Sequence, residues 1–251
     1  MKFIGIIPAR YASTRFPGKP LADIGGKLMI QRVYEQVAPC LDDVWVATDD
    51  ERIMKAVEGF GGKAVMTSDQ HRSGTDRCLE AFRNIGGYHD VIINIQGDEP
   101  FIQREQIEAL KACFDASGTV CLATLVKPFT AKDGMDALLN PNSPKVVLNK
   151  KGEAMYFSRS VVPYLRGVPQ EDWLGKGYFY KHIGIYAYRS ETLAEIAVLP
   201  QSPMELAESL EQLRWLENGY HIQTAITNIE NLAVDTPEDL EKIRKYLKSK
   251  F

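Results

Sequence analysis

The sequence of 251 residues has few cysteines, no long hydrophobic run and no excess of basic residues. No two of its four cysteines form a C-x-x-C pair, and a chain of this length needs no disulfide framework. We therefore expect Cys40, Cys78, Cys113 and Cys121 to be buried free thiols in a reducing compartment. No segment approaches the roughly 18 apolar residues of a membrane span, and the apolar stretch in "MKFIGIIPAR" is shorter than that of a signal peptide. These absences predict a cytoplasmic protein with no membrane partner.

The formal net charge of −3 argues against a general nucleic-acid binder, because such proteins usually carry a basic excess. Hydrophobic residues make up 45% and charged residues 25% of the chain, as is usual for a soluble globular protein. The clustered cations near the N-terminus are therefore a local feature, and we expect no nucleic-acid partner.

The first half of the chain alternates between short apolar segments and segments with helical spacing. Strands are expected over 2–9, 42–50, 63–68 and 90–100, and helices over 29–40, 50–62, 74–87 and 103–117, with Thr75 as an N-cap. Strands that alternate with helices at this spacing indicate an α/β fold, with a mostly parallel central sheet flanked by helices.

The alternation stops near residue 119. A strand over 119–128 is followed by a loop-rich stretch, a hairpin that turns at Lys151-Gly152 and a strand over 181–189. The sequence thus predicts one domain over 1–251 with a β-rich insertion at 127–190. A long helix is expected over 202–220, with Ser202 and Glu205 as a capping box, and a last helix begins after Thr236.

The segment "PARYASTRFPGKP", residues 8–20, lacks the glycines of two familiar nucleotide-binding loops. A Walker A loop that ends at Gly18-Lys19 would need Gly in place of Ser13, and Ser or Thr in place of Pro20. The Rossmann glycines are also missing after the first strand. Three cations remain in a loop at the carboxyl end of a strand, where open α/β sheets bind ligands. The segment is either a polyanion site or a solvated basic loop.

Two carboxylates at predicted strand ends could complete such a site with Mg²⁺, which prefers oxygen ligands. Asp98 follows the strand in "NIQGDEP", and Asp235 stands between a strand and a helix in "AVDTPEDL". Glu99 and Asp49 are weaker candidates at the same edge. Taken alone, Asp98 also fits an ordinary turn and Asp235 an ordinary helix start. The loop "HRSGTDR", residues 71–77, enters a helix whose first N–H groups suit phosphate or base edges, or are simply capped.

These segments together resemble one family. "IIPARYASTRFPGKPL", "VATDD", "HRSGTDR", "NIQGDEP", "YFSRSVVPY", "HIGIYAYR", "SLEQLR" and "VDTPEDL" match, in order, the 3-deoxy-manno-octulosonate (Kdo) cytidylyltransferases, or CMP-Kdo synthetases. The resemblance runs from residue 3 to about residue 245 and leaves 166–177 unassigned. It implies a nucleotide-diphospho-sugar transferase-like fold, a homodimer, and transfer of CMP from CTP to Kdo for lipopolysaccharide synthesis. It also implies that the 127–190 insertion contributes to the sugar pocket and to the dimer contact.

The resemblance assigns roles position by position. It implies that the nucleotide is bound by Ala9, Arg10, Ser13, Arg15, Lys19, Ser73, Gly74 and Arg77, and that Asp98 and Asp235 are ligands of Mg²⁺. It places the sugar against Gln96, Arg159, His182, Tyr186, Glu211 and Gln212. Catalysis is expected from Arg10, Arg15, Lys19 and Asp98, which would neutralise the charge of two anionic reactants.

Two other functions remain open from the sequence. One is a cytidylyltransferase for another acidic sugar, such as sialic acid or 8-amino-Kdo, although the residues from 159 to 212 match the Kdo set better. The other is a non-catalytic nucleotide-binding regulator, against which the presence of Asp98, Asp235 and Lys19 argues. The residues show no Ser-His-Asp or Cys-His pattern and name no general base.

Overall fold

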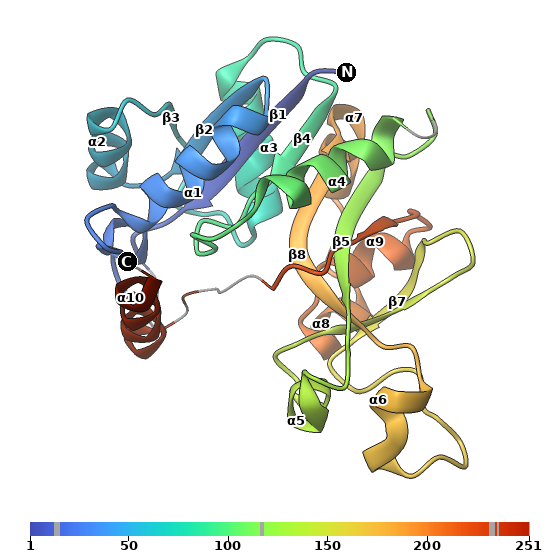
Figure 1. Cartoon of the computed structure of the whole chain (residues 1–251). Helices are drawn as coiled ribbons and strands as arrows, with labels where there is room; N and C mark the ends of the chain where they lie inside the picture. Colours follow the sequence, from blue (N-terminus) through green and yellow to red (C-terminus); the bar gives the residue numbers. More distant parts are fainter. Residues whose placement is uncertain (13–15, 116–117, 231–233, 235, 251) are drawn as a thin grey trace. The chain divides into compact units, whose positions relative to one another are not determined.

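The computed structural model describes residues 1–12, 16–115, 118–230, 234 and 236–250 (Figure 1). The chain divides into two compact units. The first comprises Met1–Glu108, Tyr188–Ala197 and Asn231–Phe251, and the second comprises Ala109–Ala187 and Val198–Glu230. Most of the segment 127–190, expected as an insertion, falls in the second unit.

The first unit contains a parallel sheet in the strand order β3-β2-β1-β4. Ile4, Ile6 and Ile7 of β1 are fully buried, as expected for a strand covered on both faces. In Figure 1, α1 lies in front of this sheet and α3 behind it. The predicted α/β fold, with a mostly parallel sheet flanked by helices, is confirmed. Its strands are β1 (Phe3–Ala9), β2 (Asp43–Thr48), β3 (Ala64–Met66) and β4 (Val91–Asn94).

Side-chain caps fix where two helices of the first unit begin. The Asp50 carboxylate accepts the Arg52 N–H at 2.9 Å, and the Ser73 hydroxyl accepts the Asp76 N–H at 3.1 Å. The prediction of Thr75 as N-cap is wrong, because Ser73 has the extended backbone of a cap and Thr75 is buried in the first turn. The helices are α1 (Met29–Val37), α2 (Glu51–Gly59), α3 (Gly74–Ile85), α7 (Ser190–Ile196) and α10 (Pro237–Lys250), with 3₁₀ turns at Lys19–Leu21 and Ala38–Cys40. Helix α4 (Arg104–Asp115) begins in the first unit and ends in the second.

The second unit contains β8-β5-β9 as neighbouring strands, and β6 pairs with both β7 and β8. The predicted hairpin is confirmed: β6 and β7 are antiparallel, and Gly152 turns the chain with φ of 75°. The strands are β5 (Leu122–Pro128), β6 (Lys145–Leu148), β7 (Ala154–Ser158), β8 (Tyr180–Arg189, whose last two residues belong to the first unit) and β9 (Gln223–Ile226). The helices are α5 (Gly134–Leu139), α6 (Trp173–Lys176), α8 (Pro203–Glu208) and α9 (Gln212–Glu217), with a 3₁₀ turn at Gln170–Asp172.

The predicted long helix over 202–220 is wrong in one respect, because it is two helices, α8 and α9. The capping box of Ser202 and Glu205 is present, but Ser209 has a left-handed backbone with φ of 49°. The Glu208 and Ser209 carbonyls, which would accept N–H bonds in a continuous helix, accept instead from Arg159, from Nε at 2.6 Å and Nη2 at 3.2 Å. A contact distant in the sequence therefore replaces local helical bonds.

All four cysteines are free thiols, as predicted. The expectation that all are buried holds for Cys40 and Cys78, whereas Cys113 is half-buried and Cys121 is exposed. Burial raises the pKa of the Cys113 thiol to about 11. None of the helices in the described ranges combines the length and the apolar character needed to cross a membrane.

Candidate active site

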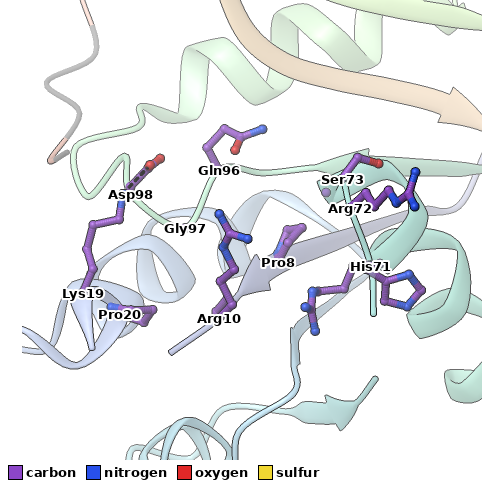
Figure 2. A pocket seen from close by; sticks show the side chains of 13 residues that line it. Pro8, Arg10, Lys19, Pro20, His71, Arg72, Ser73, Gln96, Gly97 and Asp98 are labelled. Carbon is purple, nitrogen blue, oxygen red and sulfur yellow. Dashed lines mark hydrogen bonds and ion pairs between the residues drawn. The ribbon is translucent and has the colours of Figure 1, made fainter. Parts of the chain in front are cut away.

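A cleft of about 280 Å³ opens in the first unit, at the carboxyl ends of β1 and β4 (Figure 2). It contains the predicted nucleotide-binding residues Ala9, Arg10, Lys19, Ser73, Gly74 and Arg77, together with Gln96 and Asp98. Its remaining lining residues are Pro8, Pro20, His71, Arg72 and Gly97. Three regions that are far apart in the sequence, 8–20, 71–77 and 96–98, therefore contribute residues to one edge of the sheet, where ligands of open α/β sheets bind.

The turn after β4 can reach the cleft because Gly97 has no side chain. A Cβ atom on Gly97 would lie 2.9 Å from the Pro8 carbonyl oxygen, so the two main chains approach more closely than any other residue allows. This approach brings Gln96 and Asp98 to the end of β1. Figure 2 shows Asp98 next to Lys19 at one side of the cleft, with a dashed line between the two side chains.

The cleft is strongly cationic. Four of its lining side chains, Arg10, Lys19, Arg72 and Arg77, are positively charged, and Asp98 is the one carboxylate in the lining among the residues described. Lys19 Nζ donates to Asp98 Oδ2 at 2.7 Å. This excess of positive charge suits a polyanion such as a triphosphate.

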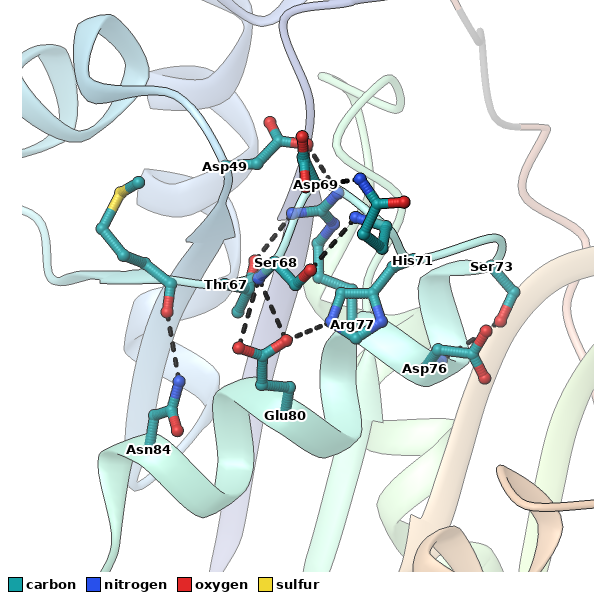
Figure 3. Close-up of polar contacts among 12 residues, drawn as sticks. Asp49, Thr67, Ser68, Asp69, His71, Ser73, Asp76, Arg77, Glu80 and Asn84 are labelled. Carbon is teal, nitrogen blue, oxygen red and sulfur yellow. Dashed lines mark hydrogen bonds and ion pairs between the residues drawn. The ribbon is translucent and has the colours of Figure 1, made fainter.

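The segment that carries His71 and Arg72 is fixed by the α3 residue Glu80 (Figure 3). Both Glu80 carboxylate oxygens accept the Ser68 N–H, at 3.0 and 3.2 Å, and Glu80 also pairs with His71 Nε2. Burial opposes the charge on Glu80, but these partners outweigh it and lower the pKa of the carboxyl. His71 and Arg72 are not among the site residues predicted from the sequence, although the quoted motif "HRSGTDR" contains both.

Arg77, predicted to bind the nucleotide, already has two side-chain partners. Its guanidinium donates to Asp49 Oδ2 at 2.8 Å and to Thr67 Oγ1 at 2.6 Å, and its side chain is only 5% exposed (Figure 3). Asp49, a weaker candidate for the metal edge, thus holds the wall of the cleft. Glu99, the other weaker candidate, is buried.

Three predicted site residues, Ser13, Arg15 and Asp235, lie outside the described residues. Within the described ranges, no three His, Cys, Asp or Glu side chains gather as a metal site. Asp98 alone among the predicted metal ligands can be placed. Its side chain is 29% exposed and lines the cleft.

The second unit gathers the other predicted sugar-binding residues around β8 and α9. His182 is buried, and its Nε2 lies 3.0 Å from the Thr124 hydroxyl. Its ring packs against those of Phe157 and Tyr186, with centroids 5.0 and 5.3 Å away. Burial lowers the pKa of His182 to about 3, so the imidazole is neutral near pH 7.

Helix α9 presents its own polar residues beside Tyr186. The rings of Tyr186 and Trp215 meet edge to face at 5.0 Å. Gln212 is buried on the same helix, and its Nε2 finds no hydrogen-bond partner among the described residues. Arg214 Nη2 donates to Glu211 Oε1 at 2.7 Å, which fixes that carboxylate. A buried amide without a partner is costly unless a ligand satisfies it.

Arg159 is bound to the main chain of its own unit. Besides Glu208 and Ser209, it donates from Nη1 to the Pro141 carbonyl at 3.0 Å. The sequence analysis missed Lys145, which is fully buried and donates to the Asn140 carbonyl at 3.0 Å. Burial lowers the pKa of Lys145. Both cations therefore bind main-chain carbonyls at 140–141, and no pattern in the sequence predicts these two contacts.

Comparison with known proteins defines first a class and then a family. A cytidylyltransferase family model matches residues 4–243. A structure of 4-diphosphocytidyl-2C-methyl-D-erythritol synthase from Anaerococcus prevotii has the same fold, with a TM-score of 0.60 at 15% identity over 98% of this chain and 99% of its own. The 3-deoxy-manno-octulosonate cytidylyltransferase of Parabacteroides distasonis is 66% identical over 248 residues, which cover 98% of each chain. A structure of CMP:2-keto-3-deoxy-manno-octonic acid synthetase complexed with CTP has a TM-score of 0.91 and 43% identity over the full length of both chains. The chain belongs to the cytidylyltransferase family, among the 3-deoxy-manno-octulosonate cytidylyltransferases.

Proposed function

We propose that the protein transfers CMP from CTP to the anomeric 2-hydroxyl of Kdo and releases pyrophosphate. The observation that carries this proposal is the cationic cleft, which contains the Asp98 carboxylate, in a chain of this family. The hydroxyl oxygen attacks the α-phosphorus in line and loses its proton. The bond between the α-phosphorus and the oxygen that bridges to the β-phosphate breaks, and pyrophosphate leaves. The CMP-Kdo formed serves lipopolysaccharide biosynthesis.

On the nucleotide side, the cations of the cleft bind the phosphates and neutralise their charge. Lys19 and Arg10 neutralise the charge that grows on the departing pyrophosphate. The start of α3 at Ser73 and Gly74 adds N–H groups and the positive end of a helix dipole, both of which favour phosphate. No covalent nucleophile is needed for this reaction.

Magnesium is part of the proposal. Asp98 supplies a hard oxygen ligand in a cleft suited to phosphates, and Mg²⁺ is commonly held by one or two carboxylates together with substrate phosphates. The donor set among the described residues therefore fits Mg²⁺, with Asp98 as its protein ligand and Asp235 as the second by resemblance. When bound, Mg²⁺ would polarise the phosphate and lower the pKa of the attacking hydroxyl.

On the sugar side, the second unit supplies neutral and fixed polar groups. Gln212 and Glu211 can bond sugar hydroxyls, and neutral His182 can act as donor or acceptor without adding charge. Arg159 stabilises the turn that precedes Glu211 through its bonds to Glu208 and Ser209. Gln96, which lines the nucleotide cleft, is the sugar-binding residue proposed in the first unit.

The assembly and the location of the enzyme are also proposals. Large apolar side chains of the second unit that are more than half exposed support a homodimer contact there: Met155, Tyr164, Tyr178, Val198, Leu206 and Ile226. The free thiols of Cys40 and Cys78 support a reducing cytoplasm.

The test is release of pyrophosphate from CTP in the presence of Mg²⁺ and Kdo. Sialic acid and 8-amino-Kdo serve as competing acceptors, and UTP serves as a competing donor. We expect the largest kcat/KM with CTP and Kdo. A larger value with another acidic sugar would assign the chain a different acceptor, and CTP binding without turnover on any sugar would make it a regulator.

A further inference from the structure

The motif "VATDD", residues 46–50, has no role in the proposed chemistry, although two adjacent acids directly follow β2 there. The first of them, Asp49, binds Arg77 at the start of α3. The second, Asp50, binds Arg52 through two bonds, from Arg52 Nε to Oδ1 at 2.9 Å and from Nη2 to Oδ2 at 2.6 Å. Such a fork fixes the plane of the guanidinium.

The fixed guanidinium of Arg52 lies on the ring of Tyr11. Its central carbon is 3.3 Å from the ring centroid, which is a close cation–π stack. Hydrogen bonding to Asp50 raises the pKa of Arg52, and the same bonds lower the pKa of Asp50. Asp50 is the less exposed partner, with 18% of its side chain accessible, so the stack is anchored at the end of β2.

Tyr11 in turn fixes the main chain at Gly18. The Tyr11 carbonyl accepts the Gly18 N–H at 2.9 Å. Gly18 has φ of 70°, and a Cβ there would lie 3.1 to 3.2 Å from atoms of the Tyr11 ring. The Tyr11 side chain therefore contacts Arg52 and leaves no room for a side chain at Gly18, so position 18 admits glycine alone without strain.

The two residues that Tyr11 joins are the chain neighbours of two cleft cations. Tyr11 follows Arg10, Gly18 precedes Lys19, and both cations line the cleft. Neither Tyr11, Asp50 nor Arg52 lines it. We propose that Tyr11 and Arg52, anchored by Asp50, are positioning residues that set Arg10 and Lys19 for the triphosphate. This inference rests on the proposed binding of CTP in the cleft.

The same unit offers a matched control. Asp43, Lys63 and Trp45 also form an acid, a cation and an aromatic ring, with Lys63 Nζ 2.7 Å from Asp43 Oδ1 and 5.5 Å from the Trp45 ring centroid. None of the three lines the cleft. The variant Lys63→Ala thus removes a similar surface trio that has no link to the cleft cations.

The experiment compares Tyr11→Ala, Tyr11→Phe, Arg52→Ala and Lys63→Ala in the full-length protein. The Kd for CTP is measured by calorimetry without sugar, and KM and kcat are measured by pyrophosphate release. Tyr11→Ala and Arg52→Ala should each raise the Kd for CTP about tenfold, since a stack is lost and two cations are displaced. Tyr11→Phe keeps the ring and should stay within about twofold of wild type, as should Lys63→Ala. The KM for Kdo should not change.

A Kd for CTP within twofold of wild type in both alanine variants overturns the inference. So does a rise of equal size in Lys63→Ala, because that result assigns the effect to general stability. Wild-type protein that binds CTP but turns over no sugar contradicts the proposed function alone, and the Kd comparison still decides this inference. Wild-type protein that binds no CTP contradicts both.

Discussion

The two units differ in how far their charged side chains are paired within the protein. Among the described residues, the cleft of the first unit presents four cations and one carboxylate, and only part of this charge is neutralised by pairing. In the second unit the comparable charged side chains already have partners within the protein. Arg159 and Lys145 donate to main-chain carbonyls, and Glu211 pairs with Arg214. The first unit is thus suited to neutralise a polyanion, and the second to orient a hydroxylated ligand by shape and fixed hydrogen bonds.

The largest effect is expected from the charges of the cleft. Asp98→Ala and Lys19→Ala should each lower kcat by about 100-fold or more, because each removes a group that stabilises charge in the transition state. Pyrophosphate release at saturating Mg²⁺ measures this. Lys55→Ala, at an exposed ion pair with Glu51, is the control and should turn over normally. Near-normal turnover of Asp98→Ala would contradict its assignment as a metal ligand.

The sugar side should respond separately from the nucleotide side. Arg159→Ala should raise the KM for Kdo by about 10- to 100-fold, because three bonds that hold the 140–141 and 208–209 segments are lost. The Kd for CTP should stay unchanged. Both constants should also stay unchanged in the control Lys176→Ala, which removes an exposed ion pair with Asp172. An equal rise in the Kd for CTP would break the distinction between the two units.

The neutral state of His182 makes a prediction about pH. Its pKa is about 3 in the folded protein and near 6.5 when unfolded, so between these values the unfolded chain binds an extra proton. This group therefore leaves the free energy of unfolding unchanged above pH 6.5. As the pH falls below that value the free energy of unfolding decreases, by about 2 kcal/mol at pH 5.

Thermal unfolding from pH 8 to pH 5 tests this. Between pH 8 and pH 5, the Tm of wild type should fall by about 4–8 °C more than the Tm of His182→Gln. His221→Gln, at a side chain that is 82% exposed, is the control variant. Parallel Tm curves for wild type and His182→Gln would show that His182 is charged or exposed in solution.

The smallest effect concerns the break between α8 and α9. A β-branched residue tolerates a left-handed backbone poorly, so Ser209→Val should be less stable than Ser209→Gly by about 1 kcal/mol. Urea denaturation compares the two directly. Equal midpoints would mean that the turn at Ser209 is not held in this conformation.

The sequence predicted most of the first unit, because its signals are local. Short apolar runs that alternate with helical segments predicted β1 to β4, and the motif "NIQGDEP" placed Asp98 beyond a strand end. The sequence did not predict features that depend on contacts between residues distant in the chain. Arg159 breaks a helix that Ser202 and Glu205 correctly begin, and Arg77 pairs with Asp49 across 28 positions. Neither pairing has a pattern in the chain.

The most direct test of the account is steady-state pyrophosphate release by the wild-type protein with CTP, Mg²⁺ and Kdo, beside reactions that omit each component in turn. We expect turnover only when CTP, the metal and Kdo are all present, with CMP-Kdo formed in a one-to-one ratio to pyrophosphate. Turnover that does not need the sugar, or binding of CTP with no turnover at any Kdo concentration, would contradict it.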